Sequence, residues 1–133
     1  MGCLRTGGAV NPMIALAGGV VGIAYWTTIS NCYTTGSISA SYPGGANNSA
    51  TAGGIVGSTS NTPTTITNCF NTASIFASAG RVDGQVSRAY AGGIVGSTRN
   101  TGVVTNSLNS GSVEASNFWG SEFTYIGDIC GDS

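Results

Sequence analysis

The sequence predicts an all-β protein, a parallel β-solenoid, and three observations lead to that prediction. A hexapeptide of the type Ala-Gly-Gly-Ile-Val-Gly recurs through the 133 residues, and a second apolar block follows each full copy. No segment has the 3.6-residue apolar period of a helix. A chain that repeats itself in this way builds one small unit several times, and each unit covers the apolar face of its neighbour.

The hexapeptide occurs in full three times, from Ala17, Ala52 and Ala91, and once in a degenerate form at Ile126–Gly131. The copies start 35, 39 and 35 residues apart. The extra residues fall in the turn after the glycine block and in a spacer, as expected for rigid segments that are joined by loops. One domain is therefore expected, with three full repeats between two half-repeats, at residues 1–16 and 126–133.

Each repeat offers three short strand candidates: the glycine block, a block such as Thr65–Phe70, and a block such as Ser74–Ala77. In the third block, Phe76 is replaced by Ser39 in the first repeat and by Glu114 in the third, while its two neighbours stay apolar. Fixed and free positions that alternate with a period of two are typical of a half-buried strand. About three strands per coil are expected, and the general rule for parallel crossovers predicts a right-handed coil.

Stacked coils bring equivalent residues into columns about 4.8 Å apart. Stacked asparagine amides can form a hydrogen-bonded ladder, and asparagine also suits a bend because it tolerates unusual backbone angles. The predicted columns are Val20, Ile55 and Ile94; Ile29, Ile66 and Val104; Tyr33, Phe70 and Leu108; and Asn31, Asn68 and Asn106.

Cysteines form a further predicted column of Cys3, Cys32 and Cys69, in which Ser107 takes the next place. Neighbouring coils would bring the Cα atoms within the range of about 4.4–6.8 Å that a disulfide needs. Two interpretations fit: one disulfide, Cys32–Cys69 or Cys3–Cys32, or a row of buried thiols that act as small apolar side chains. The chain has no His and no CxxC pair, so neither a zinc site nor a cofactor is expected.

The composition favours an extracellular or cell-surface protein. Charged residues make up only 7% of the chain, against about 25% in a typical soluble domain, and there is no Lys. The net charge of -1 and the dispersed arginines give no electrostatic basis for binding nucleic acid or an anionic membrane. The apolar run from Met13 to Tyr25 is too short to span a membrane.

The blocks of each repeat, taken together, resemble the GLUG motif repeat. In the first repeat the pattern is carried by Gly18–Gly22, Ile29–Tyr33 and Thr35–Ile38, and it recurs from Gly53 and from Gly92. GLUG repeats occur in large bacterial surface and secreted proteins, including adhesin-like chains. The resemblance implies a bacterial surface protein with a β-solenoid scaffold, and it implies no catalytic residue.

A structural, non-enzymatic role is the main expectation. The chain opens and closes inside a repeat, and a solenoid end exposes unpaired strand edges. Identical subunits are therefore expected to assemble head to tail into a fibre. A fragment of a longer adhesin is the competing explanation of the unfinished ends. The residues expected at the assembling ends are Gly2, Cys3, Leu4, Ile126, Ile129 and Cys130.

A carbohydrate-binding adhesin module is the first alternative, and surface glycans would then be its partners. The spacers would emerge on one side of the solenoid, where repeat proteins often bind, and they carry Tyr42, Phe118 and Trp119 as candidate ligand-facing residues. For Phe118 and Trp119, packing over the scaffold is the interpretation that we favour.

A carbohydrate-active enzyme and an ice-binding protein are less favoured alternatives. Glycoside chemistry uses carboxylates, and Asp128 and Asp132 in the terminal copy are its candidates. Without His, no Ser-His or Cys-His pair can form. For ice binding, outward threonine rows would be needed, and the candidates are Thr59 aligned with Thr98 and Thr62 aligned with Thr101.

Overall fold

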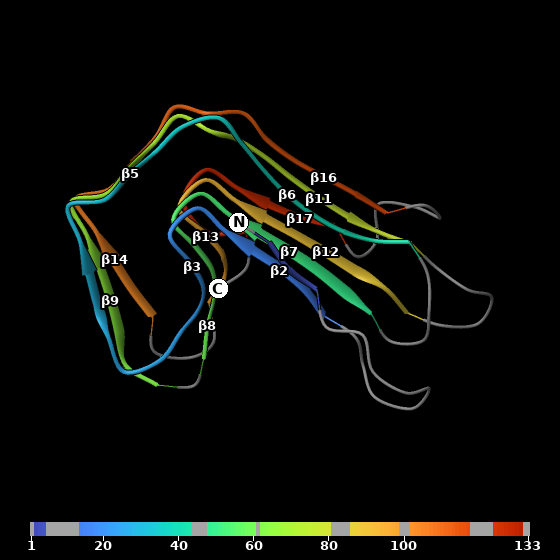
Figure 1. Ribbon diagram of the computed structural model, residues 1–133, viewed down its shortest axis with the longest axis horizontal. Helices are drawn as coiled ribbons and strands as arrows, with labels where there is room; N and C mark the ends of the chain where they lie inside the picture. Colours follow the sequence, from blue (N-terminus) through green and yellow to red (C-terminus); the bar gives the residue numbers. More distant parts are fainter. Residues whose placement is uncertain are drawn as a thin grey trace.

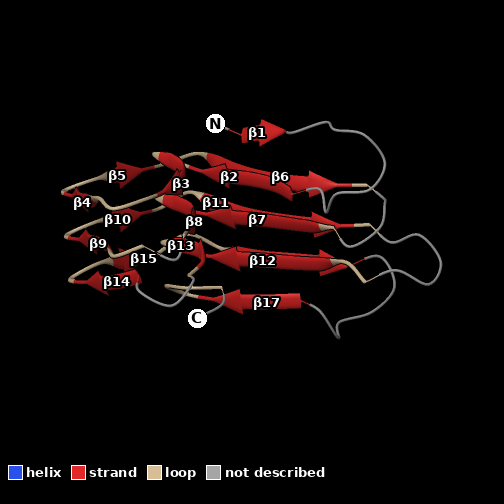
Figure 2. Cartoon of the chain, turned by 90° about the horizontal axis from the view of Figure 1, so that it is seen from below, coloured by secondary structure: helices blue, strands red, loops and turns tan. Residues whose placement is uncertain are grey.

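A parallel β-solenoid of three complete coils is seen in the computed structural model, which describes residues 2–4, 14–43, 48–60, 62–80, 86–98, 102–117 and 124–131 (Figures 1 and 2). The described residues contain strands and no helix. Strands of successive coils lie beside one another in parallel sheets, so the predicted fold class is confirmed.

Five sheets run along the stack, and we name them A to E in chain order. Sheet A contains β1 (Gly2–Leu4), β2 (Ile14–Gly18), β7 (Ser49–Gly53), β12 (Arg88–Gly92) and β17 (Thr124–Gly127). Sheet B contains β3 (Val21–Ala24), β8 (Val56–Thr59) and β13 (Val95–Ser97). Sheet C contains β4 (Thr28–Ser30), β9 (Thr64–Thr67) and β14 (Gly102–Thr105). Sheet D contains β5 (Tyr33–Thr34), β10 (Phe70–Asn71) and β15 (Leu108–Asn109), and sheet E contains β6 (Ser37–Tyr42), β11 (Ser74–Ala79) and β16 (Val113–Asn117).

The strands pair in the registers that the repeat alignment predicts. Ile66 lies opposite Ile29 on one side and Val104 on the other, and Phe70 lies opposite Tyr33 and Leu108. The backbone N–H of Val20 donates to the carbonyl oxygen of Ile55, whose own N–H donates to the carbonyl oxygen of Ile94. The three apolar columns are thus present in the structure.

Each complete coil has five short strands, because bends divide two of the three predicted strand regions. One bend, at Gly54, separates β7 from β8, and the other, at Asn68, separates β9 from β10. Asn31, Asn68 and Asn106 have φ angles of 55°, 53° and 46°, in the left-handed region that asparagine tolerates better than most residues. This column therefore lies at a bend, as predicted.

The amide ladder, in contrast, runs three residues further along the chain. Thr34 Oγ1 hydrogen-bonds Asn71 Oδ1 at 2.6 Å, and Asn71 Nδ2 donates to Asn109 Oδ1 at 2.8 Å. The predicted ladder of Asn31, Asn68 and Asn106 is wrong: these side chains are exposed at the bend, and the structure gives no hydrogen bond between these three described residues.

The glycine block forms the corner between sheets A and B. A Cβ atom on Gly53 would overlap the carbonyl oxygen of Val56 and lie 2.5 Å from the backbone nitrogen of Gly96. A Cβ atom on Gly54 would lie 2.5 Å from Asn71 Cγ. The first glycine thus allows the chain to turn tightly between two sheets, and the second leaves room for the amide ladder.

The cross-section is bent, and each of its two arms has its own apolar core (Figure 1). Sheets A and E face each other in one arm, around alanines such as Ala52 and Ala77 and the larger Ile75. Sheets B and C enclose the other core, which contains Ile55 and Ile66. These two cores fix the angle at which the outer faces of sheets A and B meet.

The N-terminal strand departs from the prediction. β1 pairs antiparallel with β2, and Cys3 lies opposite Leu16. The half-repeat expected at residues 1–16, with Cys3 stacked on Cys32, is therefore wrong for β1. Residues 33–48 connect Cys32 to β7, but only residues 4–13 separate Cys3 from β2, and a parallel crossover needs a dozen or more residues.

At the other end, β17 continues sheet A in the register of the degenerate copy. Ile126 lies opposite Ala91 and Gly127 opposite Gly92, and a bridge joins Cys130 to Val95. β1 and β17 thus make sheet A a five-stranded sheet, whereas each of the other four sheets has three strands. The handedness of the coil stays a prediction.

Candidate functional site

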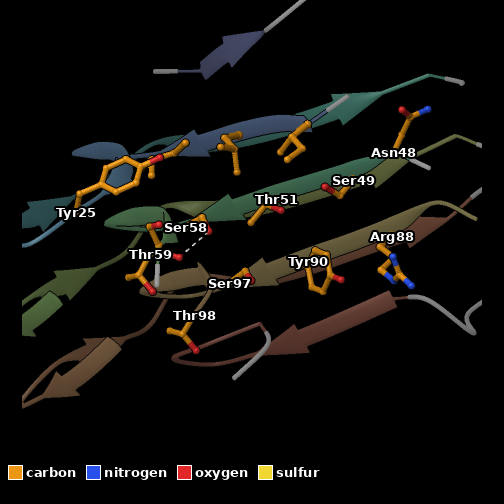
Figure 3. A pocket seen from close by; sticks show the side chains of 14 residues that line it. Tyr25, Asn48, Ser49, Thr51, Ser58, Thr59, Arg88, Tyr90, Ser97 and Thr98 are labelled. Atoms are coloured by element: carbon orange, nitrogen blue, oxygen red, sulfur yellow. Dashed lines mark hydrogen bonds between the residues drawn. The ribbon is translucent and has the colours of Figure 1, made fainter. Parts of the chain in front are cut away.

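Sheets A and B meet at the inner angle between the two arms (Figure 1). A groove with a volume of about 410 Å³ is lined by residues from the outer faces of both sheets (Figure 3). Its lining residues come from equivalent positions in all three coils, so the groove follows the stacking direction of the strands. We call it the A–B groove.

Sheet A provides one wall of the A–B groove because its residues alternate between core and groove. Alanines at two positions of each strand are buried against sheet E. The residues beside them line the groove: Ile14 and Leu16 on β2, Ser49 and Thr51 on β7, and Arg88 and Tyr90 on β12. Figure 3 shows Arg88 and Tyr90 side by side on this wall.

Sheet B and the turns after it provide the opposite wall. Ile23, Ser58 and Ser97 occupy one row across the three coils. Tyr25, Ser60 and Thr98 complete this wall, and Tyr25 is 56% exposed. Figure 3 places Tyr25 at one end of the groove, far from Arg88.

Tyrosine rings and small polar groups together determine what the groove can bind. Tyr90 stacks on Tyr125 of β17, with ring centroids 4.8 Å apart and an angle of 15° between the planes. Stacked rings present flat apolar faces, and the hydroxyls of the seryl and threonyl residues both donate and accept hydrogen bonds. An open groove with both features suits a ligand that has apolar ring faces and many hydroxyl groups.

The residues of the groove differ from the predicted ligand-facing residues. Tyr42 is partly buried and packs against the core between sheets A and E. Phe118 and Trp119 lie outside the described residues. A signal for the groove is present in the sequence, because Leu16, Thr51 and Tyr90 vary between repeats although the alanines that flank them are constant.

Cys32, Cys69 and Cys130 are free thiols in the structure. Burial raises the pKa of Cys32, and the neighbouring Cys69 thiol, which also hydrogen-bonds it, raises this pKa further. Burial also raises the pKa of Cys130. Cys69 is buried in the core between sheets B and C, and its thiol donates to the carbonyl oxygen of Thr67 at 3.3 Å. Cys32 and Cys69 therefore lie next to each other as small, largely apolar side chains.

Candidate residues for the alternative functions are spread over the chain. Within the described ranges, no group of three His, Cys, Asp or Glu side chains could hold a metal ion. Asp128 is exposed after β17, and its predicted companion Asp132 lies outside the described residues. Thr59, expected in an outward threonine row, is fully buried. Gly102 of the next coil packs over it, so this part of the ice-binding prediction is wrong.

The family model of the GLUG motif matches residues 15–39. These residues run from β2 to β6, so the motif corresponds to one turn of the solenoid. The strand registers make residues 50–76 and 89–114 the equivalent turns. Comparisons with curated proteins and with solved structures give no match. In the part of the chain that the structure describes, no helix is long and apolar enough to cross a membrane.

Proposed function

We propose that this GLUG-repeat protein is a non-enzymatic scaffold of the bacterial surface that binds extended glycan chains in the A–B groove. The observation that carries the proposal is the groove itself, which is lined by Tyr25 of the first coil, Tyr90 of the third coil, and seryl and threonyl residues of the second and third coils. A pyranose ring has an apolar face that stacks on an aromatic ring and hydroxyl groups that bond to polar side chains. One groove thus offers both kinds of contact.

An extracellular location is part of this proposal. The low charge and the abundance of glycine fit a secreted protein, and the GLUG resemblance implies a bacterial surface protein. Nucleic acid is a poor candidate for the groove because the chain contains only four basic residues. A glycan does not depend on a large basic surface for its affinity.

Tyr90→Ala is expected to weaken glycan binding by at least tenfold, or about 1.4 kcal/mol. Tyr90 lines the groove and stacks on Tyr125, so its removal deletes an aromatic platform. A glycan array would identify ligands of the wild-type protein, and calorimetry would compare the variants on the strongest ligand.

Tyr33→Ala is the matched control, because Tyr33 is an exposed tyrosine on sheet D, away from the groove. It also stacks on an aromatic ring of the next coil, Phe70, so the two variants lose similar packing. Tyr33→Ala is expected to bind the glycan as tightly as the wild type does. If Tyr90→Ala also bound it as tightly as the wild type, the proposed site would be contradicted.

Self-assembly into a fibre is the second candidate, and the open strand edges favour it. Among the described residues, sheets B to E end in β3–β6 on one side and in β13–β16 on the other. Unpaired edges are templates for strands of another chain. For head-to-tail stacking of two molecules, β1 and β17 would have to rearrange, because they extend sheet A beyond the other four sheets at the two ends of the stack.

If the protein assembles in this way, negative-stain electron microscopy of the purified protein at high concentration is expected to show filaments. Their width would match the cross-section of one solenoid, because coils add along the stacking axis. Monodisperse monomers alone at high concentration would contradict a fibre, and they would leave the glycan-binding proposal unaffected.

A further inference from the structure

Cys32 and Cys69 occupy equivalent positions in neighbouring coils, directly before the paired strands β5 and β10. Tyr33 lies opposite Phe70, and the N–H of Phe70 donates to the carbonyl oxygen of Cys32 at 2.8 Å. The two cysteines are therefore also in register, and residues in register on neighbouring parallel strands have Cα atoms about 4.8 Å apart. A disulfide requires a separation of about 4.4–6.8 Å, so the backbone already holds the two positions at a suitable distance.

The two thiol groups have the same orientation within their coils. The Cys32 thiol donates to the carbonyl oxygen of Ser30 at 3.4 Å, and the Cys69 thiol donates to that of Thr67 at 3.3 Å. The Cys69 thiol also reaches toward the first coil, where it lies 4.0 Å from the carbonyl oxygen of Ile29. A side-chain hydrogen bond joins Cys69 to Cys32, so the two sulfur atoms are neighbours.

The other cysteines lie elsewhere in the stack. Cys3 belongs to β1 of sheet A, and a bridge joins Cys130 to Val95 in the third coil. Serine takes the equivalent position in the third coil, where the hydroxyl of Ser107 donates to the carbonyl oxygen two residues earlier at 2.9 Å. Cys32 and Cys69 are thus the one pair of cysteines that the described part of the chain places in register on neighbouring coils. Ser107 also shows that this position accepts serine.

We propose that Cys32 and Cys69 form a disulfide between the first and middle coils when the protein meets a disulfide oxidant. Cys32, which is only partly buried, releases its proton to solvent, attacks one sulfur atom of the oxidant and displaces the other half as a thiolate. Cys69 then gives its proton to that thiolate, attacks the Cys32 sulfur atom and displaces the second half, which takes up a proton from solvent. Two protein thiols are thereby oxidised to one disulfide, and the disulfide of the oxidant is reduced to two thiols.

The disulfide fastens the edge of the stack. Within the described residues, β4 and β5 of the first coil have a partner strand on one side only, so the first coil can separate from the stack more easily than the middle coil. A covalent bond to the middle coil closes a loop of one full coil and restricts the unfolded chain. Disulfides persist in oxidising compartments, which fits the location proposed above, and the bond forms whether or not the groove binds a glycan.

Oxidised glutathione is the oxidant of the test, because it supplies an exchanging disulfide without a second protein. Fully reduced wild-type protein is expected to lose two of its four thiols in mildly alkaline buffer. Burial and the neighbouring Cys69 thiol raise the pKa of Cys32, and only the thiolate attacks, so the reaction should become faster as the pH rises. Trypsin leaves both cysteines in one peptide, because no Lys or Arg occurs between Arg5 and Arg81. Chymotrypsin cuts after Tyr33, and mass spectrometry then detects the two linked peptides.

Thermal unfolding tests the effect on the stack. The oxidised wild type is expected to have a Tm at least about 4 °C above that of the reduced wild type. Cys69→Ser is the matched control, because serine already occupies the equivalent position in the third coil. Treatment with oxidised glutathione should leave the Tm of Cys69→Ser unchanged. The peptide map of the wild type decides whether the bond forms even if this variant does not fold.

Three outcomes for the wild type would overturn this inference: all four thiols persist, glutathione remains attached as a mixed disulfide, or Cys3 or Cys130 is linked instead. A disulfide between Cys32 and Cys69 that leaves the Tm unchanged would overturn the fastening of the first coil. None of these outcomes bears on glycan binding, which Tyr90→Ala tests separately.

Discussion

Replacing Gly53 by alanine is expected to lower the free energy of unfolding by about 3 kcal/mol or more. Gly53 ends β7 in the middle coil, and a Cβ atom there would overlap the carbonyl oxygen of Val56. It would also lie 2.5 Å from the backbone nitrogen of Gly96 in the next coil. Both obstacles are backbone atoms, so relief requires the corner and the neighbouring coil to move apart. Urea-induced unfolding, followed by circular dichroism, measures the loss.

Another column of the glycine block supplies a matched pair of controls. A Cβ atom on Gly57 would lie 2.6 Å from the carbonyl oxygen of Gly22, whereas one on Gly22 would have no atom within 4 Å. Gly57→Ala should therefore destabilise the protein, and Gly22→Ala should change the stability by no more than about 0.5 kcal/mol. Equal losses of stability in Gly22→Ala and Gly53→Ala would contradict close backbone packing as the reason for glycine at position 53, because only the Cβ atom at position 53 meets other atoms.

Much of the scaffold could be predicted because the chain repeats itself. Aligning the copies placed Ile66 between Ile29 and Val104 without knowledge of how the coil is folded, since parallel stacking puts equivalent residues opposite each other. The same logic failed at β1. Cys3 aligned with Cys32 by identity alone, but the connection to β2 is too short for another coil, and the strand pairs antiparallel.

The amide ladder was assigned to the wrong column for a local reason. Asn31, Asn68 and Asn106 are identical in all three repeats, whereas the true ladder contains Thr34 in the first coil. Because the asparagines are identical in all copies, the alignment favoured the column of Asn31, Asn68 and Asn106 as the ladder. The positive φ angles at the bend, which the alignment does not reveal, direct those asparagines to the surface.

The groove could not be predicted because it depends on the angle between two arms. The variable positions lie on consecutive strands of sheets A and B, and the alignment gives no angle at the glycine corner between these strands. Close packing at Gly53 brings the outer faces of the two sheets together. Only then do Tyr25 and Tyr90, from different coils and different walls, line one groove.

Asn71→Ala is expected to cost about 3 kcal/mol or more of unfolding free energy, because the Asn71 side chain is fully buried and makes four hydrogen bonds to three residues. Its Oδ1 accepts from the Ala73 N–H at 3.0 Å and from Thr34 Oγ1. Its Nδ2 donates to the Ala73 carbonyl oxygen at 3.1 Å and to Asn109 Oδ1. Alanine would leave two buried backbone groups of Ala73 without these partners, at a cost of about 1–3 kcal/mol each.

Asn109→Ala is the control that separates burial from hydrogen bonding. Asn109 makes the corresponding bonds to the N–H and carbonyl oxygen of Gly111, but it lies in the last complete coil and is only partly buried. Water can replace the lost amide there, so the expected cost is about 1 kcal/mol. Urea unfolding measures the loss of unfolding free energy in both variants. The difference between the two losses is the cost of leaving the buried backbone groups of Ala73 without hydrogen-bond partners. Equal and small losses would mean that water reaches Ala73 in the middle coil, and that the ladder does not hold neighbouring coils together.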